Sequence, residues 1–207
     1  EQACENLIFE MMELSPINLA VASFGQGSNM NMMQMAAAFC SLINGGYYYQ
    51  PNVVEELQTD GGSVVEAYDK TLVRQTVSEK TCKWMREALI QTVTEGKGKE
   101  GGVPGYVIGG KSGNTEKLGE DDKARLVSFI SAAPMNDPQI MVYVVVDEAY
   151  AEDQGLSSYA CKIVSRIYAE VLPYLGIYPT ETITEEAQAA WDEKVARMDH
   201  EAVEGRK

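Results

Sequence analysis

Residues 105–116 read GYVIGGKSGNTE, and this stretch decides how the fold is interpreted. An apolar triplet, residues 106–108, is followed by two glycines and then by Lys111 and Ser112. Glycines within a strand often mark a place where a ligand or another backbone approaches closely. We therefore predict that residues 106–111 form an edge strand that ends in a lysine beside a hydroxyl group.

The same stretch also matches GxxxxGK[ST], the phosphate-binding P-loop, over residues 105–112. That motif requires an apolar strand before it and a helix that begins at the lysine. Residues 96–104 are rich in glycine and charge and end in a proline, so they cannot form a buried strand. Residues 113–119 make a poor helix. A P-loop nucleotide binder is therefore kept only as the remote alternative.

Two strands are predicted after the glycine-rich passage, at residues 126–133 and 140–146. The loop between them, residues 134–138, consists mostly of turn formers, so the strands should pair antiparallel. Residues 140–146 do not alternate between apolar and polar side chains. We therefore expect this strand to be covered on both faces and to lie centrally in its sheet.

Helical spacing of apolar residues predicts helices at residues 31–44, 79–95 and 156–172, with a weaker signal at 183–199. Asn31 with Gln34, and Thr76 with Glu79, have the spacing of capping boxes. Residues 53–57 and 64–68 should form a hairpin, and Pro173 should end the third helix. The predicted fold class is α+β, an α/β sandwich in which an antiparallel sheet is flanked by helices.

Composition excludes several classes of function. The chain has 31 acidic and 17 basic residues and a net charge of −14, which would repel nucleic acid. Its longest apolar run, residues 140–146, is far shorter than the roughly 20 residues of a membrane span. The four cysteines are scattered, and His200 is the only histidine, so we expect no zinc site, no histidine-based triad and no cofactor.

The motif at Lys111, Ser112 and Gly113 is the third signature of the penicillin-interacting serine enzymes. Other segments resemble class B penicillin-binding proteins in the same order: Asn18-Leu19-Ala20, Ala22-Ser23-Phe24-Gly25-Gln26-Gly27, Gln34-Met35, Asn44-Gly45-Gly46-Tyr47, Glu116-Lys117, Ser128-Phe129, Ala133-Pro134 and Leu172-Pro173-Tyr174-Leu175-Gly176-Ile177. The chain thus resembles the C-terminal half of that transpeptidase domain, above all its clostridial and sporulation-type members. The resemblance implies a beta-lactamase-like fold over residues 1–178, followed by a charged helical tail or linker over residues 179–207.

The resemblance implies an acyl-serine mechanism. Members of the family acylate a serine with the penultimate D-alanine of a peptidoglycan stem peptide, and a neighbouring lysine activates that serine. The serine and lysine belong to a Ser-x-x-Lys motif, which does not occur in these 207 residues. We expect that motif, a Ser-x-Asn motif and a membrane anchor to precede residue 1, and the parent to act on the extracytoplasmic face of the cell membrane. This chain alone should be inactive.

The resemblance also assigns roles to the residues of the motif. Lys111 would place positive charge beside the nucleophile, and the backbone N–H of Asn114 would form half of an oxyanion hole. Together with Asn114, the implied substrate-binding residues are Ser112, Gly113, Thr115 and Glu116.

Asn114 departs from the family, which usually has threonine or serine at this position. It therefore keeps open the alternative of a non-catalytic interaction module. The implied partners are a stem peptide ending in D-Ala-D-Ala, β-lactams and division or sporulation proteins. A truncated chain could also dimerise through an exposed apolar patch.

Overall fold

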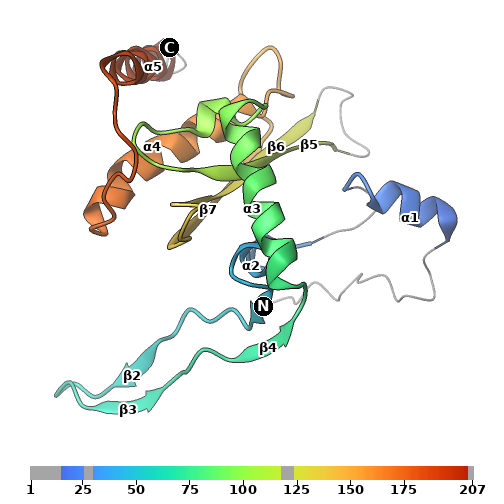
Figure 1. Cartoon of the computed structure of the whole chain (residues 1–207), viewed down its shortest axis with the longest axis vertical. Helices are drawn as coiled ribbons and strands as arrows, with labels where there is room; N and C mark the ends of the chain where they lie inside the picture. Colours follow the sequence, from blue (N-terminus) through green and yellow to red (C-terminus); the bar gives the residue numbers. More distant parts are fainter. Residues whose placement is uncertain (1–14, 26–29, 118–123, 205–207) are drawn as a thin grey trace.

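The computed structural model describes residues 15–25, 30–117 and 124–204. Its elements follow one another in the order α1 (Pro16–Ala22), α2 (Met32–Ile43), β1 (Tyr47–Tyr49), β2 (Glu56–Gln58), β3 (Val64–Ala67), β4 (Leu72–Gln75), α3 (Glu79–Thr94), a 3-10 turn η2 (Lys99–Gly101), β5 (Gly109–Glu116), β6 (Arg125–Ala133), β7 (Ile140–Asp147), α4 (Ser158–Tyr174) and α5 (Glu185–Glu204). Helices and an antiparallel sheet thus make up the body of the protein, as the sequence predicts (Figure 1).

The main sheet has the strand order β5-β6-β7, and both of its ladders are antiparallel. The predicted pairing of the two strands after the glycine-rich passage is confirmed. The prediction that residues 140–146 lie centrally is wrong, because β6 is the central strand and β7 is an edge of the sheet that the structure describes. Residues 140–146 are half-buried and apolar because helices cover both faces of the strand.

Alternate residues of β6 face two different helical layers, and the core divides accordingly. Phe129 and Ala133 pack with α4 residues such as Val164. Ile130 and Ala132 pack on the opposite face against α2 and α3 (Figure 1). The period of two in the strand therefore gives the sheet one face toward α4 and another toward α2 and α3.

The glycine-rich strand begins later than predicted. β5 starts at Gly109, not at residue 106, and continues to Glu116. Gly105 has a φ of 83°, a left-handed conformation that favours glycine, and the N–H of Tyr106 donates to the carbonyl oxygen of Val103 at 3.3 Å. Because of this turn, the chain begins to pair with β6 only at Gly109. The prediction of an edge strand is confirmed, since β5 pairs only with β6 among the described strands.

The predicted helix caps have different outcomes. The capping box of Asn31 and Gln34 is present at the start of α2. The prediction for Thr76 is wrong, because Ser78 caps α3 and accepts a hydrogen bond from the N–H of Thr81. The Thr76 hydroxyl lies 3.1 Å from both the Ser41 hydroxyl and the Gly46 carbonyl oxygen, so it joins α3 to the end of α2.

The last two helices extend slightly beyond their predicted ends. Pro173 lies within the last turn of α4, which ends two residues later than predicted, at Tyr174. The predicted helix near the C-terminus is confirmed as α5, and its Trp191 and Met198 face the rest of the protein. The domain boundary at residue 178 stays a prediction.

A two-stranded arm projects away from the body (Figure 1). Its outer part is the predicted hairpin, β2 paired with β3, and its inner part is β1 paired with β4. Every residue of β2, β3 and β4 is exposed. The arm therefore contributes little to the core that positions β5.

Candidate active site

Lys111 lies within the edge strand β5, where it is paired with Ile130. Its side chain is exposed, and its Nζ donates to the carbonyl oxygen of Ser112 at 2.6 Å. Among the residues that the structure describes, Lys111 forms no ion pair. The register puts Lys111 on the same face of the sheet as Ile130, the face toward α2 and α3.

The P-loop alternative is wrong. Lys111 lies inside a strand, and the residues after it continue that strand to Glu116 instead of starting a helix. The lysine, the hydroxyl and the glycine therefore form an extended edge, not a loop wrapped around a phosphate.

Ser112 and Asn114 share the other face of β5, since they are paired with Phe129 and Val127. The Nδ2 of Asn114 donates to the carbonyl oxygen of Gly155 at 2.6 Å. Gly155 belongs to the loop between β7 and α4. Asn114 thus connects that loop to β5 through its side chain, and one N–H and the Oδ1 of the amide can still take other partners.

Thr115 and Glu116 lie further along the strand. Five residues of extended chain place Glu116 about 17 Å from Lys111. Glu116 forms an ion pair with its cross-strand neighbour Arg125 at 3.1 Å, and Thr115 is exposed. Lys111, Ser112, Gly113 and Asn114 therefore lie side by side on one stretch of the edge strand, with Lys111 on one face and Ser112 and Asn114 on the other. Glu116 lies at the far end of the ladder.

Helix α3 supports the lysine strand through contacts that sequence reasoning missed. The Thr92 hydroxyl donates to the carbonyl oxygen of Gly110. A Cβ atom at Gly109 would lie 2.5 Å from the Cε of Met135 and 3.1 Å from the backbone nitrogen of Ile90. Gly109 thus allows β5 to lie directly against the backbone of α3 and the side chain of Met135, while Gly110 allows close packing against Phe129 and Ser131 of β6. The glycine pair was the only signal of this packing.

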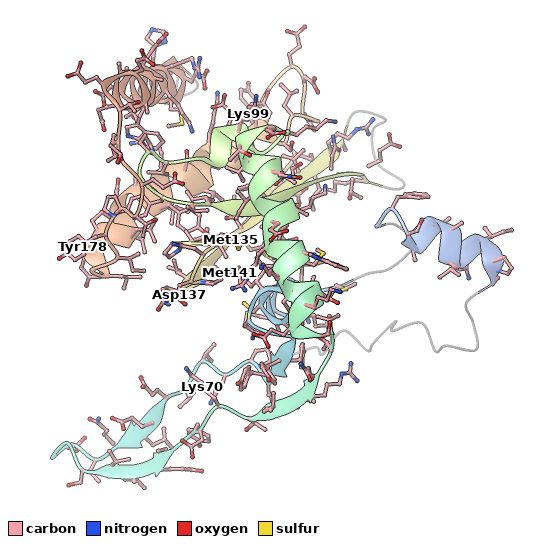
Figure 2. The ribbon with its side chains drawn as sticks, viewed as in Figure 1. Lys70, Lys99, Met135, Asp137, Met141 and Tyr178 are labelled. Atoms are coloured by element: carbon pink, nitrogen blue, oxygen red, sulfur yellow. The ribbon has the colours of Figure 1, made fainter. Side chains whose placement is uncertain are left out.

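The methionines near the strand belong to the apolar core. Met135 is 1% exposed, and Met141 packs against the same cluster. Figure 2 shows both beside α3 and α2. This face of the sheet is therefore apolar close to the exposed Lys111.

The cysteines that the structure describes are free thiols, as expected for small apolar side chains. Cys40, Cys82 and Cys161 lie in α2, α3 and α4, while Cys4 lies outside the described residues. Burial raises the pKa of Cys40 and raises that of Cys161 to about 11. These two thiols are therefore poor nucleophiles near neutral pH.

Two other features are absent from the described residues. Within the described part of the chain, no group of three histidine, cysteine or acidic side chains is arranged to hold a metal ion. No described helix combines the length and the apolar character needed to cross a membrane.

Comparison with known sequences identifies a family. The model for the penicillin binding protein transpeptidase domain matches residues 10–169. Stage V sporulation protein D of Bacillus subtilis is 34% identical over 177 residues, which are 84% of this chain and 27% of that protein. A peptidoglycan D,D-transpeptidase FtsI homolog of Mesostigma viride is 31% identical over 67% of this chain and 26% of its own length. The chain thus spans about a quarter of the length of these relatives.

Solved structures agree with this match. The transpeptidase domain of penicillin-binding protein 3 from Burkholderia pseudomallei aligns with a TM-score of 0.66 and 27% identity, over 83% of this chain and 50% of that one. Penicillin-binding protein 3 of Mycobacterium tuberculosis, complexed with ampicillin, gives a TM-score of 0.72 at 21% identity, over 83% of this chain and 40% of that one, which supports the fold alone. Together with the Lys-Ser-Gly motif on the edge strand β5, these matches confirm the resemblance seen in the sequence. The chain belongs to the penicillin-binding protein transpeptidase domain family.

Proposed function

We propose that this chain forms part of a serine D,D-transpeptidase that cross-links peptidoglycan stem peptides ending in D-Ala-D-Ala and that is acylated by β-lactams. The observation that supports this most is the position of Lys111. It is exposed on the edge strand β5, followed by a hydroxyl and a glycine, and it has no ion-pair partner among the described residues. Its charge is therefore available to an incoming carboxylate.

The proposed chemistry uses the edge of β5 to bind and polarise an acyl donor. Lys111 would attract the terminal carboxylate of the donor and stabilise a negative charge near the nucleophile. The Ser112 hydroxyl would donate a hydrogen bond in the same region, and Gly113 would let the donor approach the backbone. The backbone N–H of Asn114 would supply half of an oxyanion hole. Thr115 and Glu116 would contact the donor only at its outer end.

The nucleophile would come from outside these 207 residues. Ser-x-x-Lys does not occur in the sequence, and loss of a serine nucleophile can lower turnover about a million-fold. We therefore propose that this chain alone is inactive and that the complete gene product carries Ser-x-x-Lys and Ser-x-Asn before residue 1. An anchor there would hold the enzyme on the extracytoplasmic face of the membrane, within reach of division or sporulation proteins.

Labelling of the complete gene product with a fluorescent penicillin tests this proposal. The expected result is one covalent adduct per molecule on the upstream Ser-x-x-Lys serine, located by mass spectrometry, and no adduct on heat-denatured protein. The 207-residue chain alone should stay unlabelled. Absence of labelling in the complete, folded product would reject the proposal.

A second candidate function is a non-catalytic interaction module. It is favoured by one observation: the Asn114 side chain, at the position where the family usually carries threonine or serine, is bound to the Gly155 carbonyl oxygen. The same labelling experiment separates the two candidates. An interaction module would take up no penicillin even with the upstream segment present.

A further inference from the structure

The segment that follows α4 holds the loop that leads into β5. This C-terminal segment, residues 177–201, lies outside the range that the family model matches, which ends at residue 169. It begins near Tyr178, where the chain leaves α4, and continues into α5 (Figure 2). The C-terminal segment forms two ion pairs with α4, Lys162–Glu201 and Arg166–Asp199. It also contacts the chain that leads into β5 at two places, the turn at Gly105 and the 3-10 turn η2.

At the first place, the C-terminal segment binds the backbone of Gly105. The carbonyl oxygen of Gly105 accepts hydrogen bonds from the N–H groups of Thr180 at 2.9 Å and Glu181 at 3.1 Å. A Cβ atom at Gly105 would lie 2.8 Å from the Cβ of Pro179, so the two backbones lie close together. The Tyr106 hydroxyl donates to the carbonyl oxygen of Ile177 at 3.0 Å. The C-terminal segment is thus bound to Gly105 and Tyr106, four and three residues before β5 begins at Gly109.

At the second place, Lys194 of α5 holds η2. Its side chain is only 12% exposed, and its Nζ donates to the carbonyl oxygens of Glu100 at 2.5 Å and Gly102 at 3.4 Å. The Oε2 of Glu100 is buried without a hydrogen-bond partner, 4.0 Å from Lys194 Nζ and 3.9 Å from Arg197 Nη2. Lys194 also lies 5.0 Å from the centre of the Trp191 ring. Two cationic side chains of α5 therefore converge on one short turn.

The turn η2 is in contact with the lysine strand through one aromatic ring. A Cβ atom at Gly101 would lie 2.6 Å from the Phe129 ring, and a Cβ atom at Gly110 would lie 2.7 Å from the same ring. Phe129 is fully buried, so its ring fills the space between η2 and β5. Because packed interiors transmit displacement, a shift of η2 would reach Gly110 and the adjacent Lys111.

We infer that the C-terminal segment sets the position of β5 and that Lys194 is a positioning residue for Lys111. The segment fixes the path of residues 99–108 at Gly105 and at η2, and the Phe129 ring passes that constraint to Gly110. The effect of this constraint on acylation rests on the proposed function. The constraint itself is a property of this chain and is measurable without catalysis.

Hydrogen exchange of the 207-residue chain, followed by mass spectrometry, tests the constraint. Lys194→Met removes the donor at similar length and Lys194→Arg keeps the charge. Tyr106→Phe removes the separate bond to Ile177. Arg166→Ala is the matched control, because it breaks the ion pair between α4 and Asp199 of α5 without touching η2.

Lys194→Met and Tyr106→Phe should each speed exchange of residues 99–112 about tenfold, the size expected for one lost hydrogen bond. The control and Lys194→Arg should stay within about twofold of wild type. Unchanged exchange at residues 99–112, or equal acceleration in β1–β4, would overturn the inference.

Penicillin acylation of the complete gene product separates this inference from the proposed function. If wild type is acylated, Lys194→Met should lower the second-order acylation rate about tenfold, and Lys194→Arg should restore it. If wild type is not acylated, the proposed function fails, and the exchange result alone decides whether the segment constrains β5. An acylation rate unchanged in a variant with faster exchange would show that Lys194 does not position Lys111.

Discussion

The Thr92 hydroxyl on α3 donates a hydrogen bond to the carbonyl oxygen of Gly110, the residue immediately before Lys111. The same hydroxyl lies 2.8 Å from the Leu89 carbonyl oxygen within α3. Helix α3 therefore holds the lysine strand by a polar contact in addition to apolar packing.

Replacing Thr92 by valine should destabilise the chain by about 1 kcal/mol, because the side chain keeps its shape but leaves the Gly110 carbonyl without this donor. Chemical denaturation of the 207-residue chain measures the loss. Thr92→Ser keeps the hydroxyl and should recover most of the stability. Equal stability of the valine variant and wild type would show that the contact contributes nothing.

Gly110 should not tolerate a side chain. A Cβ atom there would lie 2.6 Å from the Ile130 carbonyl oxygen and 2.8 Å from the Cβ of Ser131. Gly110→Ala should therefore destabilise the chain by about 1–3 kcal/mol and displace β5. Gly61→Ala in the arm is the matched control, since its Cβ would meet only the Thr59 hydroxyl oxygen, at 3.8 Å. Thermal melts of equal midpoint for the two variants would contradict the close packing of β5.

Loss of the Asn114 side chain should change hydrogen exchange in the β7–α4 loop more than it changes the rate of acylation. Asn114→Ala removes the bond to the Gly155 carbonyl oxygen, so exchange of residues 150–157 should rise. Acylation of the complete gene product should fall less than about tenfold, because the backbone N–H is retained. Asn114→Thr restores the family's hydroxyl group and should be acylated at least as fast as wild type. A loss above a hundredfold in the alanine variant would show that the amide itself binds the acyl donor.

The free energy of unfolding should fall between pH 9 and pH 11 because of the buried thiol of Cys161. Burial first, and the charge of Glu100 second, raise its pKa from 9.0 to about 11 in the folded state. Between pH 9 and pH 11 the unfolded chain loses this proton more readily than the folded one. The stabilisation is therefore fully present below pH 9 and is lost as pH rises through 11, by on the order of 2 kcal/mol.

The variant Cys161→Ala isolates this effect. Its free energy of unfolding should fall less steeply than that of wild type between pH 9 and pH 11, while its loss of packing is the same at every pH. Urea titrations at pH 8 and pH 10.5 give the comparison. Parallel pH dependences would indicate that Cys161 stays protonated in both states or ionises equally in both.

The sequence predicts the elements of this fold well where local chemistry decides them. The capping box at Asn31 and the turn formers after β6 act within a few residues, so α2 and the β6–β7 pairing could be predicted. The strand order could not. An apolar run such as residues 140–146 appears the same whether strands flank it on both sides or helices cover both of its faces.

Contacts between residues far apart in the sequence could likewise not be predicted from local sequence patterns. The cap predicted at Thr76 failed because its hydroxyl is bound 35 residues away, at Ser41. Thr92 binds Gly110 of the strand, 18 residues away in the sequence. Lys194 binds Glu100 and Gly102 of the loop before the strand, 94 and 92 residues away. Only Gly109 and Gly110 hinted at such contacts, since a glycine pair in a strand indicates close approach without naming the neighbour.

The acylation rate of a Lys111 variant tests the proposed function most directly. Lys111 is exposed and the only hydrogen bond of its side chain among the described residues is to the Ser112 carbonyl oxygen, so Lys111→Ala should fold and melt like wild type. In the complete gene product, the rate of labelling by a fluorescent penicillin should fall at least about tenfold, the effect of one lost bond to a charged group. Labelling at the wild-type rate would contradict the placement of the active site on the edge of β5.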